Sequence, residues 1–174
     1  MTAVTPSVRI PVGVVVERRT ARSPWLDVVW LPVAVLSDVP ETEPWSSIAE
    51  DDAVSMFSAG PAEIELYRSE TGNYRDNLAS GAPSVWISLH ATGGDPPFII
   101  AAVTADPAEG EALTEPGNSI VEAVTMSEPI RHAIAAFVAE HYVENAFEKR
   151  KRDRADLEAL ARGGSQPGKG DERS

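Results

Sequence analysis

The chain has 174 residues, of which 43% are hydrophobic, and it contains no cysteine. This length suits one domain with a packed core plus tails, and the lack of cysteine excludes disulfides, thiolate metal sites and a cysteine nucleophile. The formal net charge is −12, and its distribution is uneven: residues 1–148 hold seven arginines, no lysine and 22 acidic residues. An acidic body disfavours nucleic-acid binding, because phosphates require clustered Lys and Arg.

The ends of the chain predict its organisation and location. The first residues show no charged segment followed by the apolar run of a secretory signal, and no stretch approaches the ~20 apolar residues that span a bilayer. We therefore expect a cytoplasmic protein without a transmembrane segment. Residues 1–7 are predicted to be a disordered lead-in, 8–148 a single domain, and 149–174 a basic helix extension followed by a disordered tail.

The first half of the domain has the pattern of a strand meander. Even positions are apolar throughout 8–16, which predicts a strand with one buried face, and Pro11 predicts a sheet edge at that point because proline has no N–H to donate. The polar residues 17–24 are predicted to be a connection. The apolar run 25–36 is predicted to be a second strand, buried on both faces, in which Pro32 indicates a bulge or a local edge.

The middle of the chain contains weaker signals. Residues 37–44 are a loop rich in proline and acidic residues, and 45–52 favour a helical turn or an irregular segment. The turn dipeptide Gly60-Pro61 predicts two separate strands on its two sides. Residues 70–78 have helix-like spacing and are predicted to be a connection of one or two turns.

Three more strands and one helix complete the predicted fold. The strands are expected at 84–91, 98–105 and 119–126, with a turn at 93–96 and a loop of low order at 106–118. A helix begins near a candidate cap at Ser127, and its apolar stripe is Ile130, Ile134, Phe137, Val138 and Tyr142. The fold class is therefore α+β: a twisted antiparallel sheet of about six or seven strands closed by one long C-terminal amphipathic helix. A partly open barrel of the pleckstrin-homology type also satisfies this pattern.

The sequence lacks the motifs of catalysis, metal binding and cofactor binding. His132 and His141 are nine residues apart on the predicted helix, so they lie on opposite faces and do not share a metal ion. There is no glycine-rich nucleotide loop and no G-x-S-x-G nucleophile elbow. We therefore predict no catalytic residue, no bound metal, no cofactor and no enzymatic activity.

Three charged segments are candidate interaction surfaces. The first is the pair Arg18 and Arg19 after the first strand. The second is Glu70, Tyr74, Arg75 and Asn77, whose side chains could instead satisfy local backbone groups. The third is the basic run that follows Phe147. It comprises Lys149, Arg150, Lys151, Arg152 and Arg154. This run could bind an acidic partner, RNA or an anionic membrane, fold back on the acidic loop at 38–52, or be a solvated helix end.

Several motifs of the chain resemble one protein family. They are IPVGVVVERR, the PW dipeptide with LPVAVL beyond it, ELYRSETGNYRDNL, SVWISL and HYVENAFEKRKRDRA. Together they are similar to an uncharacterised bacterial domain-of-unknown-function family that is typically encoded beside molybdenum-dependent formate dehydrogenase genes. The resemblance implies a non-enzymatic accessory protein for assembly or maturation of that enzyme, with a formate dehydrogenase subunit or another maturation factor as its protein partner. A small subunit of the mature complex, or a pterin-cofactor-binding domain, are the alternatives.

Members of that family are sometimes labelled molybdopterin-guanine dinucleotide biosynthesis protein A. Such a guanylyltransferase needs a glycine-rich, lysine-containing loop after its first strand. In this chain ERRTARSPW follows the first strand, and no lysine precedes Lys149. We therefore reject the guanylyltransferase label for this sequence.

Overall fold

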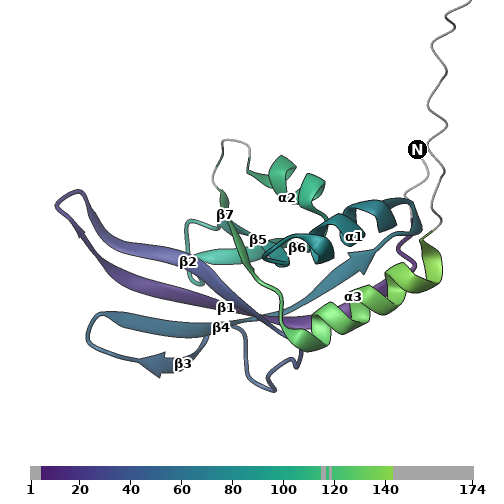
Figure 1. The fold of residues 1–174 in the computed structure, drawn as a ribbon. Helices are drawn as coiled ribbons and strands as arrows, with labels where there is room; N and C mark the ends of the chain where they lie inside the picture. The colour runs from purple at the N-terminus through teal and green to yellow at the C-terminus, as the bar shows by residue number, and fades with distance from the viewer. Residues whose placement is uncertain (1–4, 115–116, 118, 143–174) are drawn as a thin grey trace, which may run out of the picture. The chain divides into compact units, whose positions relative to one another are not determined.

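The computed structural model of the protein describes residues 5–114, 117 and 119–142. In this part of the chain, seven antiparallel strands form two sheets, and three α-helices accompany them (Figure 1). The strands are β1 (Val8–Ser23), β2 (Leu26–Leu36), β3 (Ser46–Glu50), β4 (Val54–Leu66), β5 (Ser84–Ala91), β6 (Phe98–Thr104) and β7 (Ser119–Thr125). The helices are α1 (Thr71–Ala79), α2 (Pro107–Leu113) and α3 (Glu128–His141).

The strands are divided between a four-stranded and a three-stranded sheet. Their orders are β2-β1-β4-β3 and β6-β5-β7. Strand β4 lies beside β6, and β2 lies beside β7, although each of these pairs joins different sheets. The α+β class and the number of strands are confirmed, while the single predicted sheet is two open sheets with the core between them.

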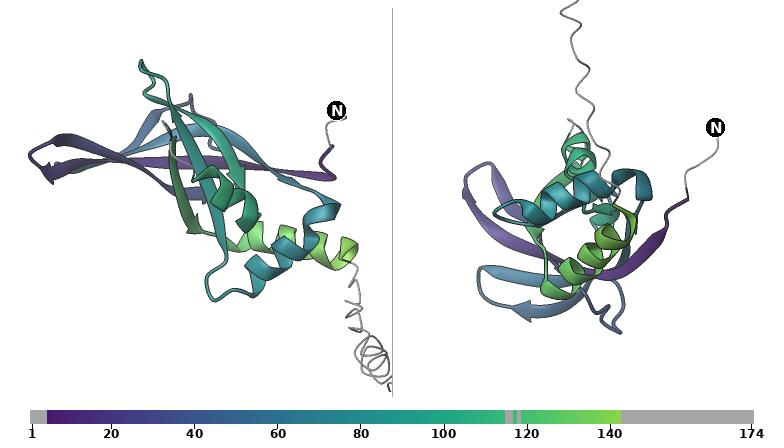
Figure 2. Two further views of the ribbon diagram at one scale, coloured as in Figure 1. Left: turned by 90° about the horizontal axis from the view of Figure 1, so that it is seen from above. Right: turned by 45° about the vertical axis from the view of Figure 1, so that its right-hand side comes forward.

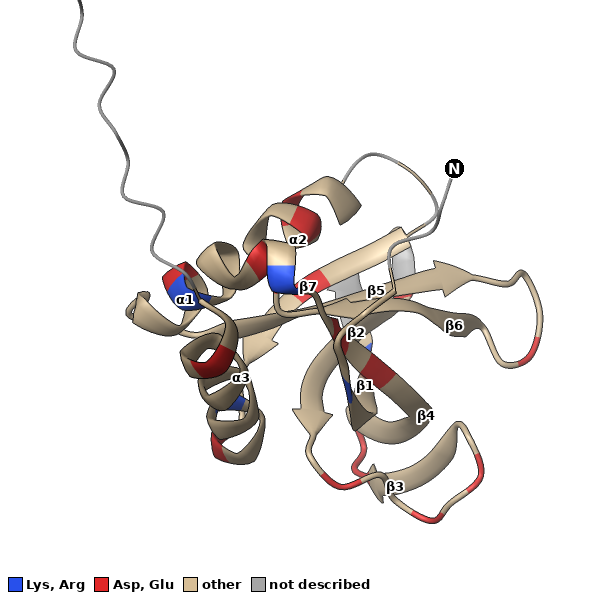
Figure 3. Ribbon diagram, turned by 90° about the vertical axis from the view of Figure 1, so that its right-hand side faces the viewer, with Lys and Arg blue, Asp and Glu red and all other residues tan. Residues whose placement is uncertain are grey.

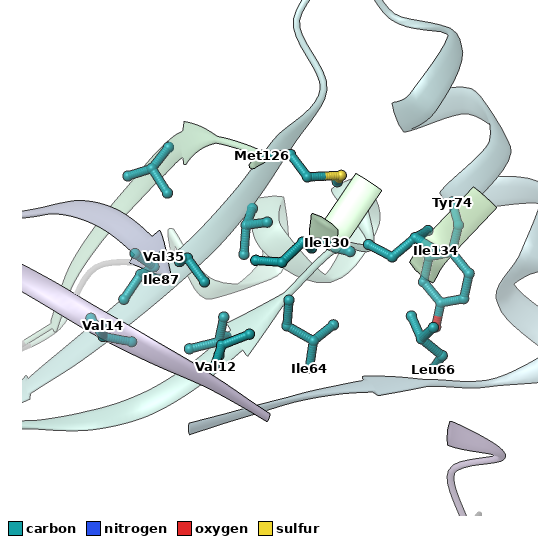
Figure 4. Close-up of a cluster of buried hydrophobic side chains, with 14 of the residues drawn as sticks. Val12, Val14, Val35, Ile64, Leu66, Tyr74, Ile87, Met126, Ile130 and Ile134 are labelled. Carbon is teal, nitrogen blue, oxygen red and sulfur yellow. The ribbon is translucent and has the colours of Figure 1, made fainter. Parts of the chain in front are cut away.

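The core is built from the alternating face that the sequence predicts for β1. Val12, Val14 and Val16 of that strand are fully buried, and they belong to one cluster with Ile87 of β5 and Ile130 of α3 (Figure 4). Helix α3 contributes its predicted stripe, of which Ile130, Ile134, Phe137 and Val138 are buried. Because apolar burial stabilises a fold by ~25 cal/mol per Å², these faces hold the two sheets and α3 together.

Strand β1 is longer than its apolar pattern predicts. The polar residues 17–23 continue the strand instead of forming a connection, because 17–19 pair with β2 on one side and β4 on the other, and Thr20 and Ser23 pair with β2. Pro11 pairs only with β4, since the ladder to β2 begins at Gly13, so the predicted edge exists at Pro11 alone. The bulge predicted at Pro32 is confirmed by a register shift opposite Val15 and Val16.

The connection from β2 to β3 crosses the four-stranded sheet, because these two strands lie at its opposite edges. It passes over the side of β1 that faces away from the core. A side chain at Gly13 would place Cβ 2.9 Å from Cδ of Pro40. At Gly60, φ is 127°, and an added Cβ would lie 3.3 Å from Cβ of Pro44. Glycine at these two positions therefore permits the crossing.

Four further segments differ from their sequence-based predictions. Strand β2, predicted to be buried on both faces, is an edge strand on which Val28 is exposed. Residues 46–50 form the edge strand β3 and not a helical turn, because they pair with β4. Gly60-Pro61 is not a turn: β4 runs through it with a register shift against β1, and this bulge uses the positive φ of glycine. The region predicted to be a loop at 106–118 contains α2, whose N-terminus is capped by Asp106 through a bond from the backbone N of Ala108.

Helices α1 and α2 lie beside the three-stranded sheet and α3 (Figure 2). Helix α2 packs on Trp86 of β5 through Gly110, where an added Cβ would lie 2.4 Å from the indole. Figures 1 and 2 also show that the β1–β2 hairpin extends well beyond the three-stranded sheet. The structure therefore has a helix-covered end and an end formed by projecting hairpins.

Candidate interaction surface

The projecting ends of the hairpins carry an aromatic cluster centred on Trp30. Its ring centroid lies 5.6 Å from that of Phe57, 5.9 Å from that of Phe98 and 6.1 Å from that of Trp45. These distances are typical of favourable aromatic pairs. Trp30, Trp45 and Phe98 pack against the core, and all four side chains are half-buried, so part of each ring remains accessible to a partner.

The strand register explains how this cluster forms. Trp30 lies opposite Arg18, Val28 lies opposite Thr20, and Phe57 lies opposite Val16. Directly opposite residues share one face of a sheet, so these side chains continue the face that buries Val16 in the core. We call Arg18, Val28, Trp30, Trp45, Phe57 and Phe98 the hairpin-end surface.

Arg18 and several apolar side chains complete the chemistry of this end. The guanidinium carbon of Arg18 lies 5.8 Å from the ring centroid of Trp30 and 6.0 Å from that of Phe57. A stacked cation of this kind contributes ~0.5–1 kcal/mol at an exposed site. Val28 is 39% exposed and Trp25, near the hairpin tip, is 87% exposed. Exposed apolar side chains grouped with an arginine and aromatic rings are typical of binding surfaces.

An acidic recess adjoins the hairpin-end surface. Its volume is about 740 Å³, and it is lined by Arg18, Glu50, Asp51, Asp52 and Ser55. Glu50 is the last residue of β3, and Asp51 and Asp52 lie on the connection to β4, where Figure 3 shows an acidic turn. Within the described ranges no ion pair neutralises them. The recess therefore presents negative charge, and Arg18 joins it to the aromatic cluster.

A second acidic recess, of about 320 Å³, lies between β4 and β6 and differs from the first. Its carboxylates already have partners: Arg9 lies 3.9 Å from Glu63 and 3.8 Å from Glu65. Tyr67 donates a 2.6 Å hydrogen bond to Glu65, and this bond raises the pKa of the Tyr67 hydroxyl. Because Glu63, Glu65 and Tyr67 already have partners within the fold, they support the structure, and we do not assign a ligand to this recess.

Two of the predicted residues on α1 have structural roles. Tyr74 is buried, and its hydroxyl accepts a 3.0 Å hydrogen bond from the backbone N of Tyr67. Burial raises the pKa of Tyr74 to about 12. The Asn77 amide donates to the carbonyls of Ser84 and Ala105 at 2.8 and 2.9 Å, and it accepts from the Ser84 backbone N at 3.0 Å. Asn77 therefore joins α1 to β5 and to the end of β6.

The other predicted residues are separated from one another. On α1, Arg75 donates a 2.7 Å hydrogen bond to the Tyr142 hydroxyl, and Glu70 accepts from Asn73. Arg19 lies on the face opposite Arg18 and is paired with the buried Glu17. The remaining candidates lie outside the described residues, and they are Phe147, Lys149, Arg150, Lys151, Arg152 and Arg154. Of the predicted set, only Arg18 belongs to the hairpin-end surface.

The aromatic members of this surface were not among the residues predicted from the sequence. Their signal is the period-two alternation, in which Val28 and Trp30 share a face across the ladder with Arg18. That signal was hidden because residues 17–24 were assigned to a connection, which would have ended the strand before Arg18. A continuous β1 through Ser23 is what places Arg18 over Trp30.

Among the described residues, no group of three or more His, Asp or Glu side chains is placed to hold a metal ion. His132 is largely exposed beside Glu128, while His141 stacks on Phe137, so the two histidines lie apart as expected. In the same part of the chain, no helix has the length and apolar character needed to cross a bilayer.

The fold and the surface define a two-sheet α+β domain with an exposed aromatic end. A family model of proteins of unknown function, DUF3305, matches residues 11–151. The chain therefore belongs to the DUF3305 family. No curated protein and no solved structure matches it.

Proposed function

We propose that this protein is a non-enzymatic accessory protein that acts by binding another protein through the hairpin-end surface. The single observation that carries this proposal is the half-buried aromatic cluster around Trp30, which continues the core-facing side of β1 from the edge of the core, beside Phe98 of β6, toward the projecting hairpin. Tryptophan and arginine are the residues most enriched among those that dominate binding energy at protein interfaces. Trp30 and Arg18 meet at the centre of this surface.

The arginines support protein binding over binding of a phosphate-bearing cofactor such as a pterin. A phosphate site needs cationic groups that converge. Here Arg9 pairs with Glu63 and Glu65, Arg75 bonds to Tyr142, and Arg131 pairs with Glu128. Three recesses on the described part of the chain are each lined by at most one arginine.

The partner follows from the family resemblance of the sequence. That resemblance implies a molybdenum-dependent formate dehydrogenase, so we propose one of its subunits, or another factor of its maturation, as the bound protein. Binding during assembly is our primary hypothesis. Permanent membership of the mature complex is the alternative, and purification of the active enzyme with this chain at fixed stoichiometry would favour that alternative.

Complementation of a gene deletion tests the proposal. Val28 and Val8 form a matched pair, because both lie on strands and they are 39% and 40% exposed. Val28→Glu places a charge on the hairpin-end surface, whereas Val8→Glu places the same charge at the start of β1, away from that surface. We expect wild type and Val8→Glu to restore formate dehydrogenase activity and Val28→Glu to fail while remaining folded. Full formate dehydrogenase activity in the deletion strain would refute the proposed role in that enzyme's assembly. Equal rescue by both variants would refute binding through the hairpin-end surface.

A further inference from the structure

The hairpin-end surface also indicates the chemistry of what binds it. The aromatic cluster forms its floor, and Glu50, Asp51 and Asp52 of the adjoining recess form an acidic rim beside it. Glu50, Asp51 and Asp52 are all exposed. They line one recess together with Arg18 and Ser55, and Arg18 in turn lies over Trp30. The recess thus adjoins the aromatic cluster through Arg18, and an occupant that covers both contacts the carboxylates as well as the aromatic rings.

The charges on this rim are not balanced within the described ranges. Arg18 is the basic residue that lines the recess, and its guanidinium stacks on Trp30 and Phe57 instead of pairing with a carboxylate. By contrast, Glu63 and Glu65 of the other acidic recess share Arg9. Closely spaced like charges repel one another, and an incoming cation relieves that repulsion.

The open edge of β3 offers backbone hydrogen-bonding groups beside this surface. This strand pairs with β4 on one side and is the last strand of its sheet. Four of its five residues are exposed, and Ile48 is 48% exposed. An exposed edge offers backbone donors and acceptors to an added extended segment. The edge, the acidic connection and the aromatic floor all lie at the same end of the sheet.

We propose that the hairpin-end surface binds a basic and apolar segment of the partner protein, in which Arg or Lys side chains contact Glu50, Asp51 and Asp52 while neighbouring apolar side chains contact the aromatic cluster. The occupant is a protein segment, because the aromatic floor and the strand edge match side chains and backbone, while the acidic rim repels nucleic acid and anionic lipid. This inference rests on the proposed function and specifies the partner of the same surface.

The test uses the full chain and a labelled synthetic peptide that alternates arginine and leucine, followed by fluorescence anisotropy. Comparison peptides carry glutamate in place of each arginine, or serine in place of each leucine. The rim variant is Glu50→Gln, Asp51→Asn and Asp52→Asn together. The matched control is Asp76→Asn, Glu111→Gln and Glu122→Gln, which removes the same charge from exposed positions elsewhere.

We expect the arginine–leucine peptide to bind more tightly than either comparison peptide. The rim variant should weaken its binding about tenfold, as the loss of several exposed ion pairs predicts, while the control triple changes it less than about twofold. Equal effects of the two triple variants, or equal binding of the glutamate peptide, would overturn the inference. If Val28→Glu still abolishes rescue in cells while the rim variant has no effect on peptide binding, only this inference fails and the proposed function stands.

Discussion

Arg18 lies directly opposite Trp30 across the β1–β2 ladder, with its guanidinium carbon 5.8 Å from the centroid of the indole. The arginine thereby covers an aromatic ring that would otherwise be more open to water. This pair links the stability of the projecting hairpins to the surface that we propose for binding.

Removal of this cation should cost little stability. We expect Arg18→Ala to lower the free energy of unfolding by about 0.5–1 kcal/mol, the usual contribution of an exposed cation–π contact. Arg68→Ala is the control, because Arg68 is exposed and lies outside the aromatic cluster. Urea denaturation measures both. A loss for Arg18→Ala no larger than for Arg68→Ala would contradict the contact.

Asn77 should be essential to the fold and not to recognition. Asn77→Ala leaves the backbone N and O of Ser84 and the carbonyl of Ala105 without their amide partner. Because a buried unsatisfied polar group costs ~1–3 kcal/mol, we expect a loss of about 2–4 kcal/mol in total. Asp76→Ala, at the exposed neighbouring position, should change stability by less than about 0.5 kcal/mol. Thermal denaturation of the two variants decides the question, and similar midpoints would refute the role of Asn77.

The contact between α2 and β5 gives a third prediction. Gly110→Ala would place a methyl group 2.4 Å from the indole of Trp86, so we expect a loss of about 1–3 kcal/mol from overpacking. Gly72→Ala on α1 meets nothing within 4 Å and should be neutral or stabilising by up to about 1 kcal/mol. In a Trp86→Ala background the cost of Gly110→Ala should largely disappear. Persistence of the full cost in that background would show that another contact is responsible.

Tyr74 predicts a specific dependence on alkaline pH. Burial raises its pKa from 10.0 to about 12 in the folded state. A raised folded-state pKa contributes stability that is fully present below the unfolded pKa and is lost as pH rises through the folded value. The ionisation of Tyr74 should therefore leave the free energy of unfolding unchanged at neutral pH and lower it between pH 10.0 and about 12. Tyr74→Phe should reduce that decline, and an unchanged alkaline profile would argue against a buried hydroxyl.

Whether a strand or helix could be predicted from the sequence depends on whether it has an apolar face directed at the core. Strands such as β5 were predictable because Val85, Ile87 and Leu89 alternate on one buried face. The continuation of β1 past Val16 was not predictable. Polar residues on a projecting hairpin have no core-facing pattern, and their strand conformation depends on pairing with β2 and β4. Helix α2 was missed because its seven residues pack through a glycine, which leaves no apolar stripe.

The candidate site was only partly predictable for a related reason. Local charge patterns identified Arg18, but they equally identified Tyr74 and Asn77, whose hydrogen bonds to distant segments appear only in the folded chain. The aromatic cluster combines Trp30 and Phe57 with Phe98 of the other sheet. Such a combination depends on the topology of two sheets and is not encoded in any single sequence window.

Site-specific photo-crosslinking in the host organism tests the central claim most directly. A photoreactive amino acid replaces Val28 on the hairpin-end surface or, in the control, the equally exposed Val8. The account predicts a covalent adduct with a formate dehydrogenase subunit or maturation factor from position 28 and none from position 8. An adduct with such a protein from position 8 and none from position 28 would contradict it.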